Sequence, residues 1–114
     1  MTPVSHKLHE QLTIIGWMSV PAGHSLAYWT MRLADELATS ARYDAMRRQL
    51  LEAAWEGIRP ATTSTYAVSA SLPVLVEAIL DRNAHRLNGR HEQSVRELRK
   101  AIDDVASLRI AKAA

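Results

Sequence analysis

The chain contains no cysteine among its 114 residues. This absence excludes disulfide bonds, thiolate nucleophiles and cysteine-based zinc or iron–sulfur sites, and it is compatible with a reducing compartment. Glycine is also scarce, and the four glycines are isolated at positions 16, 23, 57 and 89. No glycine-rich loop is therefore available to cradle a phosphate group. The sequence predicts a protein without a cofactor.

Long hydrophobic runs are missing as well. The longest uninterrupted apolar run covers about four residues, at 26–29, whereas a membrane-spanning helix needs about 20. The N-terminal sequence MTPVSHKLHEQL has no apolar run after a basic start, so no secretory signal is visible. We therefore expect a soluble, cytoplasmic protein that does not bind a membrane.

Length and composition are those of an ordinary globular domain. The hydrophobic content is 47% and the charged content 23%, which is too apolar for a disordered chain. A chain of this length forms one core without metal or disulfides, so we expect a single domain over residues 1–114. The net charge of +2 is unevenly spread, since residues 1–57 carry −1 and residues 58–114 carry +3.

Apolar residues recur at helical spacing along most of the chain. The pattern predicts an all-α fold, an irregular bundle of four to five helices at about 3–16, 25–38, 41–57, 72–88 and 90–111. Pro21-Ala22-Gly23 is expected to form a turn, and residues 61–71 a loop with at most one helical turn near Tyr66. No segment has the alternation that is typical of a strand.

The stretch from residue 24 to residue 58 has no internal proline, and glycine enters only at its end. Its apolar stripe shifts by roughly a quarter turn near Thr39-Ser40 at about 100° per residue, and Ser40 is a suitable N-cap for a second helix. We prefer two helices that meet near Ser40. A single bent helix over 25–57 is the alternative.

Candidate metal ligands are few. His6 and His9 share one helical face and Glu10 follows, but two histidines do not make a site and the zinc-protease order H-E-x-x-H is absent. His91 falls on the same helical face as Val95 and is expected to be a hydrogen-bonded histidine at the edge of the core. No metal site is predicted.

Catalytic patterns are also missing. The chain has no G-x-S-x-G nucleophile motif. The carboxylate pairs at 35–36 and 103–104 are adjacent in sequence, so the two members diverge by about 100° on a helix and cannot face each other as a dyad. We expect a protein that is not an enzyme. A small enzyme with a site assembled from residues distant in sequence is a further alternative.

Basic residues gather between residues 82 and 100. Glu92 and Arg96, like Arg99 and Asp103, are spaced by four, so they are expected to form exposed ion pairs. The candidate anion- or nucleic-acid-binding residues are Arg82, Arg86, Arg90 and Arg96. They support the alternative of a nucleic-acid-binding regulator that uses this basic helical hairpin.

An apolar band in the second half of the central stretch is wider than one core face requires. Leu51, Trp55 and Ile58 form its outer part, and Tyr28 lies about 100° from the core stripe of its own helix. Such a band is buried either by another element of the fold or by a second chain. Tyr28, Leu51, Trp55 and Ile58 are the predicted partner-binding residues.

The leading functional hypothesis is a non-catalytic protein–protein interaction module. It would be a small regulator, adaptor or inhibitor that binds and covers the surface of a partner protein, with a homodimer as a further option. An inhibitor encoded by a phage or another mobile element would fit this profile. No motif in the chain is specific enough to indicate a family.

Overall fold

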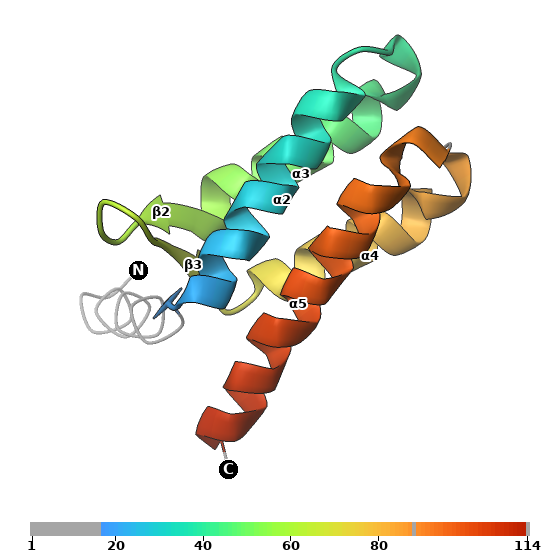
Figure 1. The fold of residues 1–114 in the computed structure, drawn as a ribbon. Coiled ribbons are helices and arrows are strands. Elements are labelled where there is room, and N and C mark those ends of the chain that lie inside the picture. The colour runs from blue at the N-terminus through green and yellow to red at the C-terminus, as the bar shows by residue number, and fades with distance from the viewer. Residues whose placement is uncertain (1–16, 88, 114) are drawn as a thin grey trace, which may run out of the picture.

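A computed structural model of the chain describes residues 17–87 and 89–113. The helix expected at 3–16 lies outside this described part. Strand β1 (Trp17–Ser19) is followed by helices α2 (Pro21–Leu37) and α3 (Asp44–Gly57), strands β2 (Ile58–Pro60) and β3 (Tyr66–Ser69), and helices α4 (Leu72–Asn83) and α5 (Glu92–Ala113). Helix α2 packs against α3 and α5, and α4 packs against the same two helices, so the four form a closed arrangement (Figure 1).

Helix α2 begins earlier than predicted. Val20 is its extended N-cap residue and Pro21 occupies the first turn, where a missing N–H costs nothing. The expectation of a turn at Pro21-Ala22-Gly23 is therefore wrong. Gly23 serves another purpose, because a Cβ atom there would lie 3.2 Å from the Tyr66 carbonyl oxygen and 3.3 Å from Val68 Cγ2. The glycine lets α2 lie directly against β3.

The central stretch forms two helices, which is the arrangement that the sequence favours. Helix α2 ends at Leu37, and a 3₁₀ helix, η1 (Ala41–Tyr43), leads into α3. The Ser40 hydroxyl accepts a hydrogen bond of 3.3 Å from the backbone N–H of Arg42 and so caps η1. The prediction of a break at Ser40 is confirmed, and the single bent helix is excluded.

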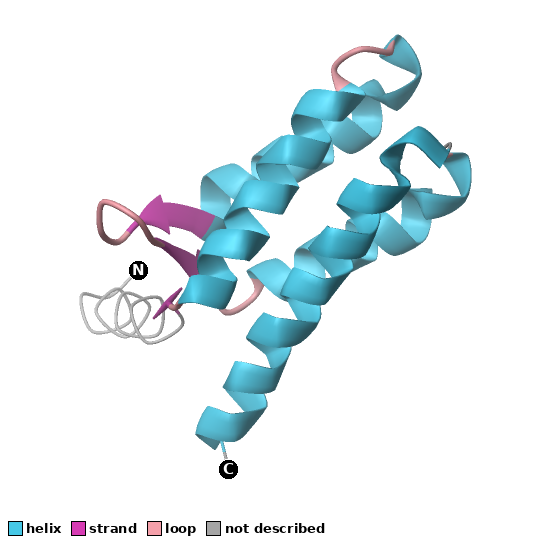
Figure 2. Ribbon diagram, in the orientation of Figure 1, coloured by secondary structure: helices cyan, strands magenta, loops and turns pink. Residues whose placement is uncertain are grey.

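The expectation of an all-α fold needs correction. A small antiparallel sheet with strand order β1-β3-β2 lies at one end of the helices (Figure 2). Strand β3, where the sequence predicts a loop or helical turn, pairs with β1 and β2 on its two sides; Val68 lies opposite both Met18 and Ile58. The strands escape prediction because they are three to four residues long, and because Ala67 and Val68 are both buried. Such a segment has no alternation to detect.

The two C-terminal helices differ from prediction mainly at their ends. Helix α4 stops at Asn83, five residues before the predicted end at 88, and α5 begins at Glu92 rather than at 90. The Asn83 amide donates a 2.7 Å hydrogen bond to the Ile79 carbonyl. Two 3₁₀ helices, η2 (Ala84–Arg86) and η3 (Gly89–His91), lie between α4 and α5.

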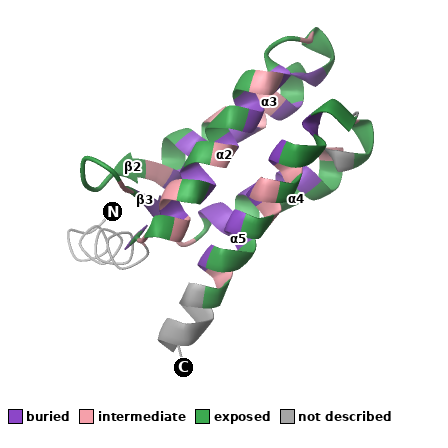
Figure 3. Ribbon diagram, in the orientation of Figure 1, coloured by how far each residue is buried: buried purple, intermediate pink, exposed green. Residues whose placement is uncertain are grey.

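The hydrophobic core lies between the four helices and beneath one face of the sheet (Figure 3). Its largest fully buried aliphatic side chains come from every described α-helix and from β3: Leu26, Leu33, Leu37, Leu50, Val68, Leu72, Val76, Leu80, Leu98 and Val105. The helical fold class is therefore correct in its coarse form. Within residues 17–87 and 89–113, none of the helices is both long and apolar enough to cross a membrane.

Candidate protein-binding groove

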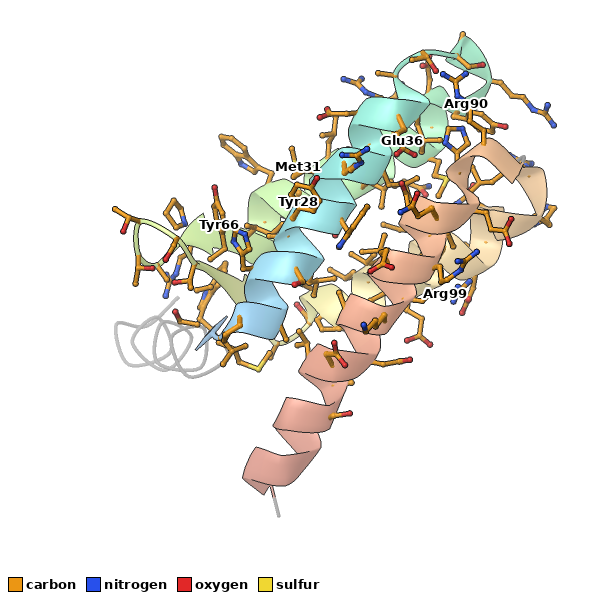
Figure 4. The ribbon with its side chains drawn as sticks, in the orientation of Figure 1. Tyr28, Met31, Glu36, Tyr66, Arg90 and Arg99 are labelled. Carbon is orange, nitrogen blue, oxygen red and sulfur yellow. The ribbon has the colours of Figure 1, made fainter. Side chains whose placement is uncertain are left out.

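A groove of about 1090 Å³ runs along the outer side of α2 and α3 and ends at the sheet. Helix α2 supplies one wall with residues that recur every three or four positions and so share one helical face. This wall comprises His24, Ala27, Tyr28, Met31, Arg32, Asp35 and Glu36. Figure 4 shows Tyr66, Tyr28, Met31 and Glu36 in succession along this side of the molecule.

Helix α3 supplies the opposite wall. Leu51, Ala54 and Trp55 line the groove from its C-terminal half, and Ile58 continues the wall into β2. Leu51 and Ile58 are partly buried against the core, whereas Trp55 is 88% exposed. A tryptophan in this position contributes a large apolar surface that nothing in the described fold covers.

The end of the groove at the sheet is closed by Arg59, Pro60 and Tyr66. The ring of Tyr66 stacks on His24 with a centroid separation of 5.5 Å, which joins β3 to the first turns of α2. The Arg59 guanidinium lies 4.3 Å from the ring centroid of Trp17 in β1, in the geometry of a cation–π contact.

Exposed apolar side chains concentrate at this groove. Six large hydrophobic residues are exposed in the described part of the chain, and four of them, Tyr28, Met31, Trp55 and Tyr66, line the groove. The other two, Val74 and Leu75, lie on α4. Scattered single exposures are normal on a protein surface, but a cluster of this kind is typical of a binding site.

The four residues predicted to bind a partner, Tyr28, Leu51, Trp55 and Ile58, all line the groove. Met31 and Asp35 line the groove but are not among the predicted residues, although both share the helical face of Tyr28 and that spacing could have identified them. Arg59 and Tyr66 line it as well and are not predicted either. These two reach the groove through the short sheet, for which the sequence carries no signal.

Charges lie along the rim of the groove. Arg32 donates a 3.0 Å hydrogen bond to the Tyr28 hydroxyl, and its Nε lies 3.5 Å from Glu36 Oε1. In the part of the chain that the structure describes, Asp35 and Arg59 form no ion pair. The groove therefore carries one carboxylate and one guanidinium without an ion-pair partner, and these two are called its uncompensated charges. The contact of the Arg59 guanidinium with the Trp17 ring does not neutralise its charge.

Glu36 also takes part in a polar cluster between α2 and α5, the Glu36 network (Glu36, His91 and Ser94). The Ser94 hydroxyl donates a 2.6 Å hydrogen bond to Glu36 Oε1, and His91 Nδ1 lies 3.2 Å from Oε2. Since a carboxylate only accepts, the Nδ1–H of His91 is the donor. Burial by itself raises the pKa of Glu36, but the hydrogen bonds from Ser94 and His91 and the charge of Arg32 hold that pKa below its ordinary value.

The Glu36 network joins residues that are far apart in sequence, which is the arrangement that a small enzyme would need. However, the Ser94 hydroxyl contacts the carboxylate and not the imidazole, so it lacks the serine–histidine bond that activates a nucleophile. His91 is 4% exposed and packs edge-on against the Tyr43 ring at 5.7 Å. The prediction of a hydrogen-bonded histidine at the edge of the core is confirmed.

The predicted anion-binding arginines lie around the connection between α4 and α5. Arg82 ends α4, Arg86 lies in η2, Arg90 in η3 and Arg96 in the second turn of α5; all four are exposed or partly exposed. Arg96 pairs with Glu92 at 3.4 Å, as the spacing predicts.

Arg99 does not form its predicted pair. It contacts Asp81 of α4 at 3.2 Å instead of Asp103. Arg99 thus pairs with Asp81 on the neighbouring helix and not with Asp103 on its own helix, so this ion pair joins α4 to α5.

The candidate ligands His6, His9 and Glu10 lie outside the described residues. Over residues 17–87 and 89–113, no three histidine, cysteine, aspartate or glutamate side chains are grouped so that they could hold a metal ion. Comparison of the chain with protein-family models, with curated proteins and with solved structures gives no match.

Proposed function

We propose that the chain is a non-catalytic protein-interaction module and that the groove between α2, α3 and the sheet is its binding surface. One observation carries the proposal: four of the six exposed large hydrophobic residues in the described part of the chain line this groove. Aromatic residues, methionine and arginine are the side chains that are enriched in the centres of protein interfaces.

The free energy that a partner gains by covering Trp55 is large enough to support this proposal. A tryptophan side chain buries roughly 150–250 Å² when it is covered, and Trp55 is 88% exposed. At about 25 cal/mol per Å², covering it contributes about 4 kcal/mol before the entropic costs of association. Trp55 is therefore the expected energetic centre of the interface.

The finer proposal is a small regulator, adaptor or inhibitor that covers the surface of a partner protein in the cytoplasm. The chain's lack of cysteine is compatible with a reducing compartment. The partner side chains that fit the groove are apolar, because Ala27, Ala54 and Leu51 line it between the two helices.

The test is an affinity pull-down that compares the wild-type chain with Trp55→Ala and with Val74→Ala. Val74 is a matched control, since it is exposed and apolar but lies on α4, outside the groove. We expect Trp55→Ala to lose the captured proteins and Val74→Ala to retain them, with unchanged circular dichroism for both. Equal capture by all three chains would contradict the proposal.

Nucleic-acid binding is the second candidate, supported by the position of Arg82, Arg86 and Arg90 around one helical connection. Binding through these arginines would weaken steeply with salt, because phosphate contacts release counterions. Nuclease treatment of the pull-down separates the two functions. Arg86→Glu combined with Arg90→Glu should abolish retention of a DNA or RNA fragment if this candidate is correct, and should leave capture through the groove unchanged.

A further inference from the structure

The two uncompensated charges of the groove lie near its opposite ends. Arg59 is at the sheet end, beside Tyr66, which stacks on His24 near the start of α2. Asp35 lies eleven residues further along α2, which corresponds to about 16 Å at 1.5 Å per residue. The groove is therefore basic at one end and acidic at the other.

The groove also presents a projection on one wall and a flexible side chain on the other. Trp55 stands at the sheet end of α3, two residues before the helix gives way to β2, and it is almost fully exposed. Met31 lies on the opposite wall, one helical turn from Asp35. Both walls of the groove therefore expose apolar surface, and a two-fold symmetric interface buries the same patch on both subunits.

We propose that a second copy of this chain occupies the groove, in a homodimer whose two-fold axis crosses the groove near its middle. The two α2 helices run antiparallel across this interface. Asp35 then faces Arg59 of the partner subunit, and Trp55 extends toward the acidic end of the opposite groove. The inference rests on the proposed function, because it names the partner that the same surface binds.

Charge complementarity selects this occupant and this orientation. The two-fold rotation places the acidic end of one groove on the basic end of the other, so each uncompensated charge meets an opposite one, twice per dimer. A parallel arrangement would instead place Asp35 on Asp35 of the partner subunit and the two Arg59 guanidinium groups on each other, and like charges in contact disfavour association.

The experiment measures the mass of the full chain by sedimentation velocity from about 1 to 100 µM, a range that spans the affinities of moderate dimers. We expect the wild type to dimerise, and Asp35→Arg and Arg59→Asp each to weaken dimerisation by about tenfold or more. Each single variant brings like charges together in its own homodimer. Glu77→Arg on α4, which makes the same charge change outside the groove, should dimerise like the wild type.

Mixing the two variants gives the sharper result. In a heterodimer of the Asp35→Arg chain with the Arg59→Asp chain, both contacts between positions 35 and 59 join opposite charges, whereas each homodimer of a variant contains only like-charge contacts. Their equimolar mixture should therefore dimerise more tightly than either variant alone, with a heterodimer mass in native mass spectrometry. If either reversal disturbs the circular dichroism, Asp35→Asn and Arg59→Gln replace it and should weaken dimerisation without repulsion.

Two outcomes would overturn the dimer: a wild-type chain that stays monomeric at about 100 µM, or single reversals that dimerise as tightly as the wild type. The proposed function fails separately. A monomeric chain that loses captured proteins on Trp55→Ala removes the second copy as the occupant but keeps the groove as a binding surface. If the chain is monomeric and captures the same proteins with and without Trp55→Ala, both the second copy as the occupant and the groove as the binding surface are ruled out.

Discussion

Replacement of Glu36 by glutamine tests the Glu36 network. The substitution keeps the size and one acceptor oxygen of the side chain but removes its charge. Ser94 and His91 then donate to a neutral amide, or to nothing, where each now donates to a carboxylate oxygen at 2.6 and 3.2 Å. Because His91 and Ser94 are buried, neither can regain its partner from bulk water.

The expected loss in the free energy of unfolding follows from the contacts of Glu36 with Ser94 and His91. Hydrogen bonds to a charged group contribute roughly 1.5–3 kcal/mol each. The Glu36 side chain is 28% exposed, and the amide retains part of the bonding, so the loss is smaller than the sum of the two contributions. We expect Glu36→Gln to lower the free energy of unfolding by about 2 kcal/mol near pH 6.

The loss should depend on pH with a definite sign. The folded-state pKa of Glu36 is lower than its ordinary value of 4.5. A depressed carboxylate pKa adds stability that is complete above the unfolded-state value and disappears as the pH falls through the folded-state pKa. The difference between wild type and Glu36→Gln should therefore be largest above pH 4.5 and shrink below it.

Urea unfolding near pH 6 and near pH 3.5, followed by circular dichroism, measures this difference on either side of the ordinary carboxylate pKa. Glu77→Gln is the matched control, since it makes the same change at an exposed carboxylate on α4 that lies outside the groove and forms no ion pair in the described chain. It should change stability by less than about 0.5 kcal/mol. A Glu36→Gln loss that is equal at both pH values, or no larger than the control, would refute the role given to the network.

Two further substitutions test the fold. In Gly57→Ala the new Cβ would lie 2.9 Å from Leu72 Cδ1 and 3.2 Å from Leu72 Cβ, so thermal unfolding should show a loss of stability of about 1–3 kcal/mol. Gly89→Ala is the control: its Cβ would meet nothing within 4 Å, so the substitution should be neutral or slightly stabilising. Ser40→Ala removes the acceptor for the Arg42 N–H and should cost about 0.5–1 kcal/mol in urea unfolding; a neutral result would show that this cap contributes nothing to stability.

The helices of this chain are predictable because burial on one helical face leaves a period of three to four residues in the sequence. The break at Ser40 is predictable for the same reason, since the stripe changes phase there. The first residues of helices are harder to predict from the sequence. Pro21 and Gly23 resemble a turn, but the proline is a first-turn residue and the glycine is required by the close approach of β3.

The candidate site is predictable only on its helical side. The band of Leu51, Trp55 and Ile58 is wider than one core face, and that width alone indicates the α3 wall. The sheet side of the groove cannot be predicted from the sequence, because the pairing of β3 with strands from distant parts of the chain decides where Tyr66 and Arg59 lie. Likewise, nothing in the local sequence joins Glu36 to His91 and Ser94, which lie 55 and 58 positions later.

The attachment of α2 at both ends has a kinetic consequence. The absence of a side chain at Gly23 lets the first turn of α2 lie directly against β3, and Glu36 ties its last turn to α5. The wall of the groove is thus already in place when an occupant arrives, and binding needs no prior rearrangement of the helix. Association should therefore proceed in a single bimolecular phase with a rate constant in the ordinary range of about 10⁵–10⁷ M⁻¹s⁻¹, and substitutions in the groove should act on how long a complex lasts rather than on how fast it forms.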